Sequence, residues 1–268
     1  MTRAEPAGAD PAPARAPRVI KRIVFVALGL VVALALLLAI EVIVAMRREY
    51  LPTTPALAIG GTFGDVDAPP LTFVVLGDST AAGVGAGSAA DAYPTRLARR
   101  IAREHFFRVR LVALGVSGAR VAGVLDEQLP RALDEDPALV FVGIGANDVT
   151  HVTRLDDVED DMAALLDRLR ERGVATVIAG PPDMRSPVFL EPLRTIVGWR
   201  GQAVAERIEA AAQDAGAGVV PLADGTRDFF AEDPDRYYAE DDFHPSAAGY
   251  ALWADVIYPY VERVLPKR

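Results

Sequence analysis

Four short clusters combine glycine with serine, asparagine, aspartate or histidine, and these residue types together suit attack on an acyl group. In chain order the clusters are Gly77-Asp78-Ser79-Thr80, Gly115-Val116-Ser117-Gly118, Gly145-Ala146-Asn147-Asp148 and Asp241-Asp242-Phe243-His244-Pro245. A serine hydroxyl is a weak nucleophile and needs a base within hydrogen-bond reach. Histidine suits that task because imidazole changes charge near physiological pH. The clusters therefore predict nucleophilic catalysis by a serine.

Ser79 is the predicted nucleophile and His244 the predicted base. The histidine needs a carboxylate to set its tautomer and to stabilise the imidazolium. Asp241 stands three residues before His244 and can supply it if the loop makes a single turn. A tetrahedral intermediate also needs donors directed at its oxyanion. The candidates are the backbone N–H groups of Ser79 and Gly118 and the side-chain amide of Asn147, and a glycine at 118 lets the backbone approach a ligand closely.

The elements that must position these clusters are short apolar runs alternating with amphipathic patterns. Strands are predicted at 71–77, 108–115, 138–145, 175–180 and 218–222, and helices at 93–104, 121–133, 155–172, 196–215 and 247–265. Asp91 is the expected N-cap of the first helix. This alternation predicts a doubly wound α/β fold with a parallel sheet covered on both faces. Sites in such sheets form at the carboxyl ends of the strands, and the first three clusters each follow a predicted strand.

The four clusters, in this order, resemble the SGNH (GDSL-like) hydrolase family, which is named for serine, glycine, asparagine and histidine in four separated blocks. The matching motifs span 77–245 and are GDST with Ser79, VSGA with Gly118, GAND with Asn147, and DDFHP with Asp241 and His244. The first block departs from the namesake motif, because Thr80 stands where that motif has leucine.

The resemblance implies a flavodoxin-like three-layer α/β/α fold with a five-stranded parallel sheet. It implies ester or thioester hydrolysis on a triad of Ser79, His244 and Asp241, with no metal and no cofactor. Asp242 competes with Asp241 for the triad, and the family's spacing of three residues favours Asp241. Neither of the other histidines, His105 and His151, has both a carboxylate three residues before it and a proline after it. A role for His151 near the cleft stays open.

Two further segments are candidates for the wall of a cleft. An aromatic group precedes or adjoins the base and consists of Phe229, Phe230, Tyr237, Tyr238 and Phe243. It either lines an apolar acyl pocket or packs a long loop, and the sequence leaves both interpretations open. The loop at 181–184 follows a predicted strand and is expected to border the cleft.

An apolar segment precedes the globular part. Ile23 to Ile40 is a run of eighteen residues without a charge, after which Glu41 interrupts and the run continues to Met46. At 1.5 Å per residue the uncharged run makes about 27 Å of helix, close to the thickness of a bilayer's hydrocarbon core. The pattern predicts a transmembrane signal-anchor helix over 23–46. A cleaved signal peptide is the alternative, and either would export the domain.

The predicted organisation is a disordered basic tail at 1–22, the transmembrane helix, a linker at 47–70 rich in proline and glycine, and a hydrolase domain at 71–268. Four Lys or Arg residues closely precede the apolar run and two follow it. The positive-inside rule then places the domain outside the cytoplasm, on a single-pass protein of the cell membrane.

The composition excludes several classes of function. The chain has no cysteine, which rules out disulfides, thiolate metal sites and a cysteine nucleophile. Of the net charge of −9, residues 1–48 contribute +4, which leaves −13 for the remainder. An acidic body of this kind argues against nucleic-acid binding.

The sequence therefore predicts a membrane-anchored, extracytoplasmic serine hydrolase that cleaves a small-molecule or lipid carboxylic ester through an acyl-enzyme. A lipid, an acyl ester and an acetylated glycan are all candidate substrates. Acyl transfer on the same triad is an alternative, because an alcohol can replace water at the acyl-enzyme. A non-catalytic anchored binding module is a second alternative, since a fold does not determine function.

Overall fold

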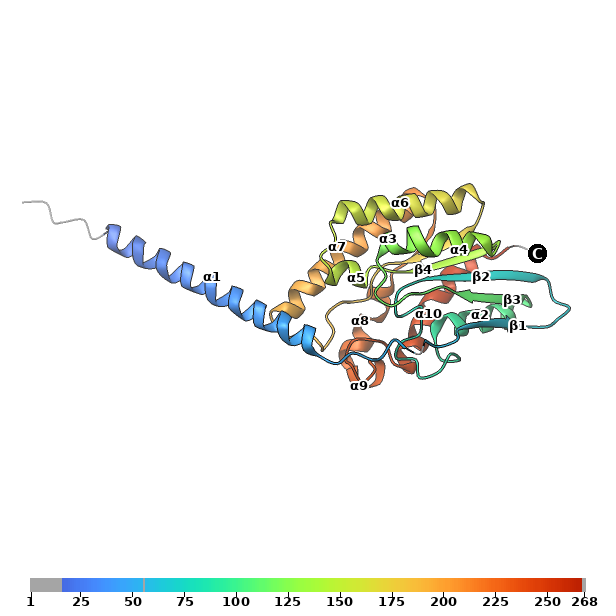
Figure 1. Ribbon diagram of the computed structural model, residues 1–268, viewed down its shortest axis with the longest axis horizontal. Helices are drawn as coiled ribbons and strands as arrows, with labels where there is room; N and C mark the ends of the chain where they lie inside the picture. Colours follow the sequence, from blue (N-terminus) through green and yellow to red (C-terminus); the bar gives the residue numbers. More distant parts are fainter. Residues whose placement is uncertain (1–15, 55, 267–268) are drawn as a thin grey trace, which may run out of the picture. The chain divides into compact units, whose positions relative to one another are not determined.

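The computed structural model describes residues 16–54 and 56–266, and the chain divides into two units, Met1–Met46 and Arg47–Arg268 (Figure 1). The predicted disordered tail lies outside the described residues up to position 15. From Ala16 onward the chain is helical, so residues 16–22 extend the predicted apolar helix instead of belonging to a tail. The second unit begins at Arg47, whereas the sequence predicted a domain from residue 71.

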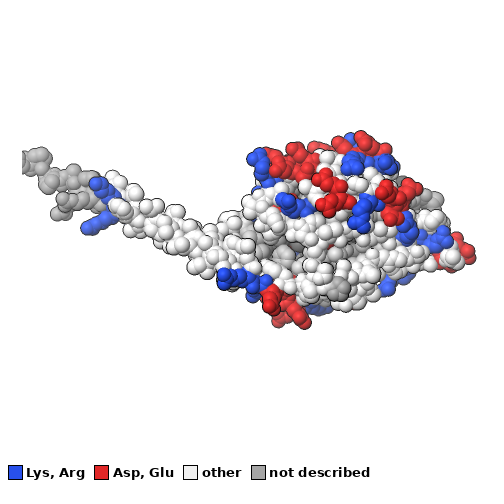
Figure 2. Space-filling model, in the orientation of Figure 1, with Lys and Arg blue, Asp and Glu red and all other residues white. Residues whose placement is uncertain are grey.

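Helix α1 (Ala16–Arg47) forms the first unit. Its stretch Ile20–Arg47 is long and apolar enough to cross a membrane, with a mean hydropathy of 3.2 in its most apolar window. Figure 2 shows an uncharged surface along most of this helix and basic side chains near both of its ends. A signal sequence has the same character, so the helix is consistent with either a signal sequence or a signal anchor.

The second unit is built on one sheet of six strands. The strands are β1 (Gly60–Phe63), β2 (Pro70–Gly77), β3 (Arg108–Ala113), β4 (Leu139–Gly143), β5 (Ala175–Ala179) and β6 (Gly218–Val220). Their order is β1-β3-β2-β4-β5-β6, and all neighbouring pairs are parallel except β1 with β3. The five predicted strands are present, and their order is that of flavodoxin-like sheets.

Strand β1 corrects two predictions, the five-stranded sheet and the linker at 47–70. It pairs antiparallel with β3, from Gly60 opposite Val112 to Phe63 opposite Val109. Its sequence, Gly-Gly-Thr-Phe, is too short to show an alternating pattern. It becomes a strand because the edge of β3 would otherwise present unpaired N–H and C=O groups. Part of the predicted linker, Gly60–Phe63, is therefore an edge strand of the sheet.

Helices cover both faces of the sheet, which makes the predicted three layers. They are α2 (Tyr93–His105), α3 (Val121–Gly123), the π-helical turn η1 (Val124–Gln128), α4 (Leu129–Asp134), α5 (Ala146–Thr150), α6 (Leu155–Glu171), α7 (Leu193–Asp214), α8 (Leu222–Glu232), α9 (Pro234–Tyr237) and α10 (Ala247–Val264). The sequence did not predict α5, α8 or α9. Asp91 is not the N-cap of α2: Ala92 is, and Asp91 accepts hydrogen bonds from Ser88 and Arg96.

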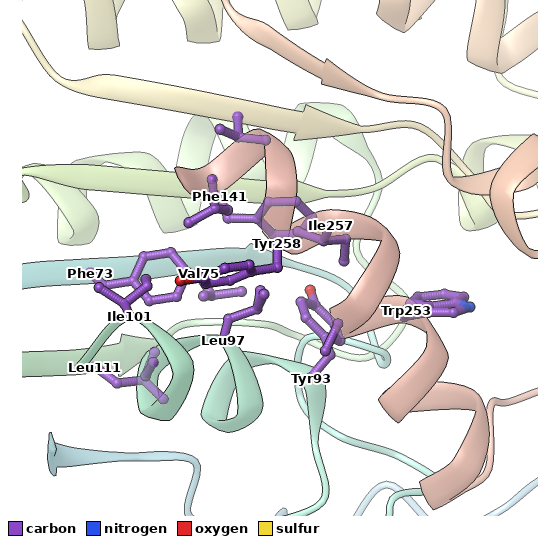
Figure 3. Close-up of a cluster of buried hydrophobic side chains, with 14 of the residues drawn as sticks. Phe73, Val75, Tyr93, Leu97, Ile101, Leu111, Phe141, Trp253, Ile257 and Tyr258 are labelled. Carbon is purple, nitrogen blue, oxygen red and sulfur yellow. The ribbon is translucent and has the colours of Figure 1, made fainter. Parts of the chain in front are cut away.

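Strand β2 shows how the core is divided between the two faces. Figure 3 shows Phe73 and Val75 of β2 gathered with Leu97 and Ile101 of α2 and with Tyr258 of α10. The alternate residues of β2 belong to a second buried cluster with residues of η1, α4, α6 and α7. Because successive strand residues point to opposite faces, β2 is buried on both sides, as its largely apolar run predicts.

The strand order brings three of the four clusters together at the carboxyl ends of adjacent strands. The chain leaves β2 for β3 on one side and returns to β4 on the other, so β2 lies between them. Gly77 at the end of β2 stands opposite Gly143 at the end of β4. The clusters of Ser79, Gly118 and Asn147 thus follow three adjacent strands at a switch in strand order, where open α/β sheets form their sites.

Candidate active site

The side chains of Ser79, His244 and Asp241 form a continuous chain of contacts. Ser79 Oγ lies 3.0 Å from His244 Nε2, and His244 Nδ1 lies 2.6 Å from Asp241 Oδ2. All three residues are buried, with exposed fractions of 9%, 6% and 7% respectively. The serine is separated from the histidine by 165 residues, so only the fold brings them together.

The loop between α9 and α10 makes the single turn that this arrangement needs. Asp241 Oδ1 accepts hydrogen bonds from the backbone N–H groups of Phe243 at 3.1 Å and His244 at 2.9 Å. Asp242 adopts a positive φ of 57°, and its carboxylate faces Arg48 at 3.2 Å. The Asp241 carboxylate is therefore the one that contacts the imidazole.

The electrostatics keep Asp241 ionised. Burial by itself raises the pKa of Asp241, but hydrogen bonds from the side chain and backbone of His244 and from the N–H of Leu51 outweigh it and lower that pKa to about 2. An ionised carboxylate accepts only, so His244 Nδ1 is assigned as the donor and Nε2 is left to accept from the Ser79 hydroxyl. This is the tautomer that a general base requires.

A tight turn after β2 presents Ser79. Gly77 has a φ of +151°, and a Cβ there would lie 2.2 Å from the carbonyl oxygen of Gly143, so only glycine fits. The Asp78 carboxylate accepts hydrogen bonds from the N–H of Thr80 at 2.9 Å and from its hydroxyl at 2.8 Å. Burial raises the pKa of Asp78. Thr80 thus uses its hydroxyl to brace the turn at the position where the family's namesake motif has leucine.

Gln128 braces the same turn, and the sequence interpretation missed it. Its amide donates to the carbonyl oxygen of Gly77 at 2.8 Å and accepts from the Gly77 N–H at 2.9 Å. Gln128 is 1% exposed and ends the π-helical turn. A signal was available, because Gln128 falls on the apolar stripe of Val121 and Val124, where a polar residue needs a buried partner.

Replacing Gln128 by leucine is expected to lower the free energy of unfolding by about 1–3 kcal/mol, because it leaves the buried Gly77 N–H without its acceptor. Urea denaturation with an unchanged m value would measure this effect. The matched control is Gln202→Leu on α7, whose amide contacts only the exposed Glu206 among the hydrogen bonds described, and it should stay within about 0.5 kcal/mol. Equal stabilities of the two variants would contradict a bracing role.

Hydrogen bonds connect the segments that carry the second and third clusters. Asn147 Nδ2 donates to the carbonyl oxygen of Ala119 at 3.0 Å, and Asp148 accepts from the N–H of Val121 at 3.1 Å. Gly118 has a φ of +83° in the turn closed by the Ala119 N–H and the Val116 carbonyl oxygen. The amide of Asn147 has two N–H bonds, so one remains to face a ligand.

A small pocket of about 40 Å³ adjoins two of the three contacting side chains, Ser79 and His244. Its lining includes Ser79, Asn147 and His244 from the predicted site, and Pro182, Asp183 and Met184 from the loop expected to border the cleft. Among the residues described, Gly118 is not in this lining and connects to it through Ala119 and Asn147.

The sequence left open whether the five aromatic residues line a pocket or pack a loop, and the structure places some of them in each role. Phe230, Tyr238 and Phe243 line the pocket. Phe229 is 48% exposed, and the ring of Tyr237 packs on Phe230 with their centroids 5.5 Å apart. The first three form an apolar wall, and the other two belong to the packing of the loop.

Neither of the other histidines is among the residues described that line the pocket, although His151 contacts the backbone of Asn147. His105 pairs with Glu262 at 3.1 Å, and His151 Nδ1 contacts the carbonyl oxygen of Asn147 at 2.9 Å from an exposed position. Within residues 16–54 and 56–266, no group of three or more His, Cys, Asp or Glu side chains is placed to hold a metal ion.

Residues 75–252 match the model of the GDSL-like Lipase/Acylhydrolase family, and this stretch is more than half of the chain. The chain belongs to this family. The matched stretch contains all five predicted site residues, Ser79, Gly118, Asn147, Asp241 and His244.

Two esterases are similar to this chain in sequence. The GDSL-like esterase Rv1075c of Mycobacterium tuberculosis is 33% identical over 189 residues, which cover 69% of this chain and 60% of that protein. The esterase TesA of Pseudomonas aeruginosa is 29% identical over 131 residues, which cover 47% and 63%. The matched regions thus span less than two thirds of either relative.

Solved structures share the fold. A crystal structure of TesA aligns with a TM-score of 0.60 and 24% identity, over 72% of this chain and 99% of that one. The match to the GDSL-like family begins inside β2, so β1 and the segment before it lie ahead of the family's pattern.

Proposed function

We propose that this GDSL-like protein is a serine esterase that cleaves carboxylic esters through an acyl-enzyme on Ser79. The observation that carries the proposal is the contact chain from Ser79 Oγ through His244 to the ionised Asp241, at 3.0 Å and 2.6 Å. Nucleophile, base and orienting carboxylate are all within hydrogen-bond reach, as nucleophilic catalysis requires.

The reaction has two halves. Ser79 Oγ bonds to the ester carbonyl carbon while His244 Nε2 takes the hydroxyl proton, and the carbonyl electron pair moves onto oxygen. The alcohol then leaves with that proton, and the acyl group stays on Ser79. A water molecule, deprotonated by His244 in the same way, attacks the acyl-enzyme, releases the acid and restores the serine.

The oxyanion is proposed to bind the N–H groups of Ser79 and Gly118 and the free N–H of Asn147. The support is positional, because Ser79, Gly118 and Asn147 follow three adjacent strands and the bond from Asn147 Nδ2 to Ala119 joins two of the three. Donors held in this way before the substrate arrives are the ones that stabilise developing charge most effectively.

The size of the pocket favours short acyl groups. The space beside Ser79 is only about 40 Å³, which suits an acetyl- or propionyl-sized group better than a long chain. Met184, Phe230 and Phe243 close it with bulky side chains. We therefore expect turnover to fall as the acyl chain lengthens.

Met184→Ala should move this preference toward longer chains, because it removes a side chain from the pocket wall. The ratio of kcat/KM for hexanoyl over acetyl p-nitrophenyl ester should rise about ten-fold or more, since each buried methylene contributes about 0.8 kcal/mol. Met162→Ala is the matched control, because Met162 is also buried and belongs with Met184 to the second buried cluster, but it is not among the residues described that line the pocket. An unchanged ratio in Met184→Ala would exclude Met184 from the acyl pocket.

Helix α1 is proposed to be a membrane anchor with the catalytic domain outside the cytoplasm. The support is its length, its apolar character and the excess of Lys and Arg before the apolar run. Protease added to intact cells should remove the domain, whereas protection would reverse the orientation. A product that starts after the helix would identify a cleaved signal sequence instead.

Hydrolysis of p-nitrophenyl esters from acetyl to dodecanoyl, by the full chain in detergent, tests the proposed activity directly. We expect turnover that is greatest on the shortest esters and is lost in Ser79→Ala. No turnover on any ester, from protein shown to be folded, would contradict the esterase proposal.

A further inference from the structure

The carboxylate of Asp241 has four hydrogen-bond donors, and one of them comes from a distant part of the chain. Oδ1 accepts from the N–H groups of Phe243 and His244, and Oδ2 accepts from His244 Nδ1. The fourth donor is the backbone N–H of Leu51, 3.1 Å from Oδ2 and 190 residues earlier in the sequence. Two carboxylate oxygens offer about four acceptor positions, so all of them are occupied.

The residues around Leu51 also contact the loop between α9 and α10, which carries Asp241 and His244. Arg48 Nη1 lies 3.2 Å from Asp242 Oδ2, in a pair whose side chains are 40% and 45% exposed. The ring of Tyr50 meets that of Phe243 edge-on, with centroids 5.6 Å apart and an interplanar angle of 78°. Three successive residues of the loop, 241–243, are thus each contacted by a residue of the segment 48–51.

These contacts differ in kind from those inside the loop. The other three donors to Asp241 belong to the loop and move with it, so they hold its internal shape. The Leu51 N–H instead holds Oδ2, the same oxygen that contacts the imidazole, against a separate segment. The ion pair of Arg48 with Asp242 is exposed and contributes little by itself. A hydrogen bond to a buried carboxylate is charge-assisted and stronger.

We propose that the segment Arg48–Leu51 is a positioning element of the active site, with the Leu51 N–H holding Asp241 in the orientation that aligns His244 with Ser79. The proposal rests on the esterase function proposed above. The segment precedes the stretch 75–252 that matches the family, so it is a feature of this chain beyond the family's pattern. The segment begins directly after Arg47, the last residue of α1. The residues that connect the apolar helix to the domain therefore also hold the carboxylate of the triad.

The test uses Leu51→Pro in the full chain, because proline has no backbone N–H. The substitution suits the site, since Leu51 already precedes Pro52 and is restricted to an extended backbone. Thr54→Pro is the matched control: it introduces proline before Pro55 at an exposed position three residues on. Leu51→Ala keeps the N–H and serves as the conservative variant.

We expect Leu51→Pro to lower kcat about ten-fold with KM within about two-fold, the effect of losing one charge-assisted hydrogen bond. Thr54→Pro should keep the wild-type kcat. Leu51→Ala should retain most of it, because it keeps the backbone N–H. The downfield proton resonance of the short bond between His244 and Asp241 should shift in Leu51→Pro and stay in place in Thr54→Pro. Thermal unfolding of each variant separates this effect from a loss of folded protein.

Two results would overturn the proposal while leaving the esterase function intact: a wild-type kcat and resonance in Leu51→Pro, or equal losses of kcat in Leu51→Pro and Thr54→Pro. Failure of the esterase proposal is distinguishable from both, because the wild-type chain would then show no turnover on any ester. The resonance still reports the contact of Leu51 with Asp241 in that case.

Discussion

Replacing Ser79 by alanine is expected to lower kcat by about 10⁴–10⁶-fold while the protein stays folded, because the acyl group then has no nucleophile to accept it. Ser79 Oγ makes one described side-chain contact, with His244 Nε2, so its removal disturbs little else. Turnover of p-nitrophenyl acetate by the full chain measures the first effect, and thermal unfolding measures the second.

Ser88→Ala is the matched control, because Ser88 donates to Asp91 and lies outside the pocket lining. It should retain the wild-type rate. A phosphonate inhibitor should also label one peptide of the wild-type chain, with the added mass on Ser79, and should leave Ser79→Ala unmodified. Substantial turnover by Ser79→Ala, or a label on another residue, would show that the mechanism is wrong.

Asp241→Asn is expected to lower kcat by about 10³–10⁴-fold, because an amide can donate as well as accept and no longer favours the Nδ1–H tautomer of the histidine. Asn fills the same space, so the loop should keep its turn. The loss should appear in kcat more than in KM, since Asp241 acts on the base and is absent from the pocket lining described.

The neighbouring Asp242→Asn provides a closely matched control. Asp242 has a positive φ of 57°, which asparagine tolerates well, and its carboxylate faces Arg48. Its rate should stay within about three-fold of the wild type, as expected for an exposed ion pair. If Asp242→Asn proved the more damaging substitution, the assignment of the triad carboxylate would have to be exchanged.

The strands and the candidate site residues could be read from the sequence because their signals are local. A buried parallel strand is a largely apolar run: β4 is one throughout, and β2 and β5 each contain a single threonine. Serine, asparagine and histidine stand in clusters directly after strands or before the last helix, so their types and order indicated acyl chemistry. The doubly wound rule then placed the first three clusters at one edge.

What escaped prediction depends on partners far away in the chain. β1 exists because β3 has an open edge, and Gln128 matters because Gly77 needs both a donor and an acceptor. Asp91 carries the residue type of a helix cap but bonds Ser88 and Arg96 instead. In each case the local sequence permits several partners, and tertiary packing selects one.

The amino-acid sequence indicated the architecture, an apolar helix followed by an α/β domain, and it indicated the proposed chemistry through Ser79, Asp241 and His244 in family order. Only the tertiary structure decided how those residues are held. In the folded protein, part of the predicted linker is the strand β1, and the N–H of Leu51 lies against the carboxylate of Asp241. The reason is physical. Periodicity and residue type report what a segment can bury or catalyse, whereas a hydrogen bond across 190 residues depends on the folded positions of both partners.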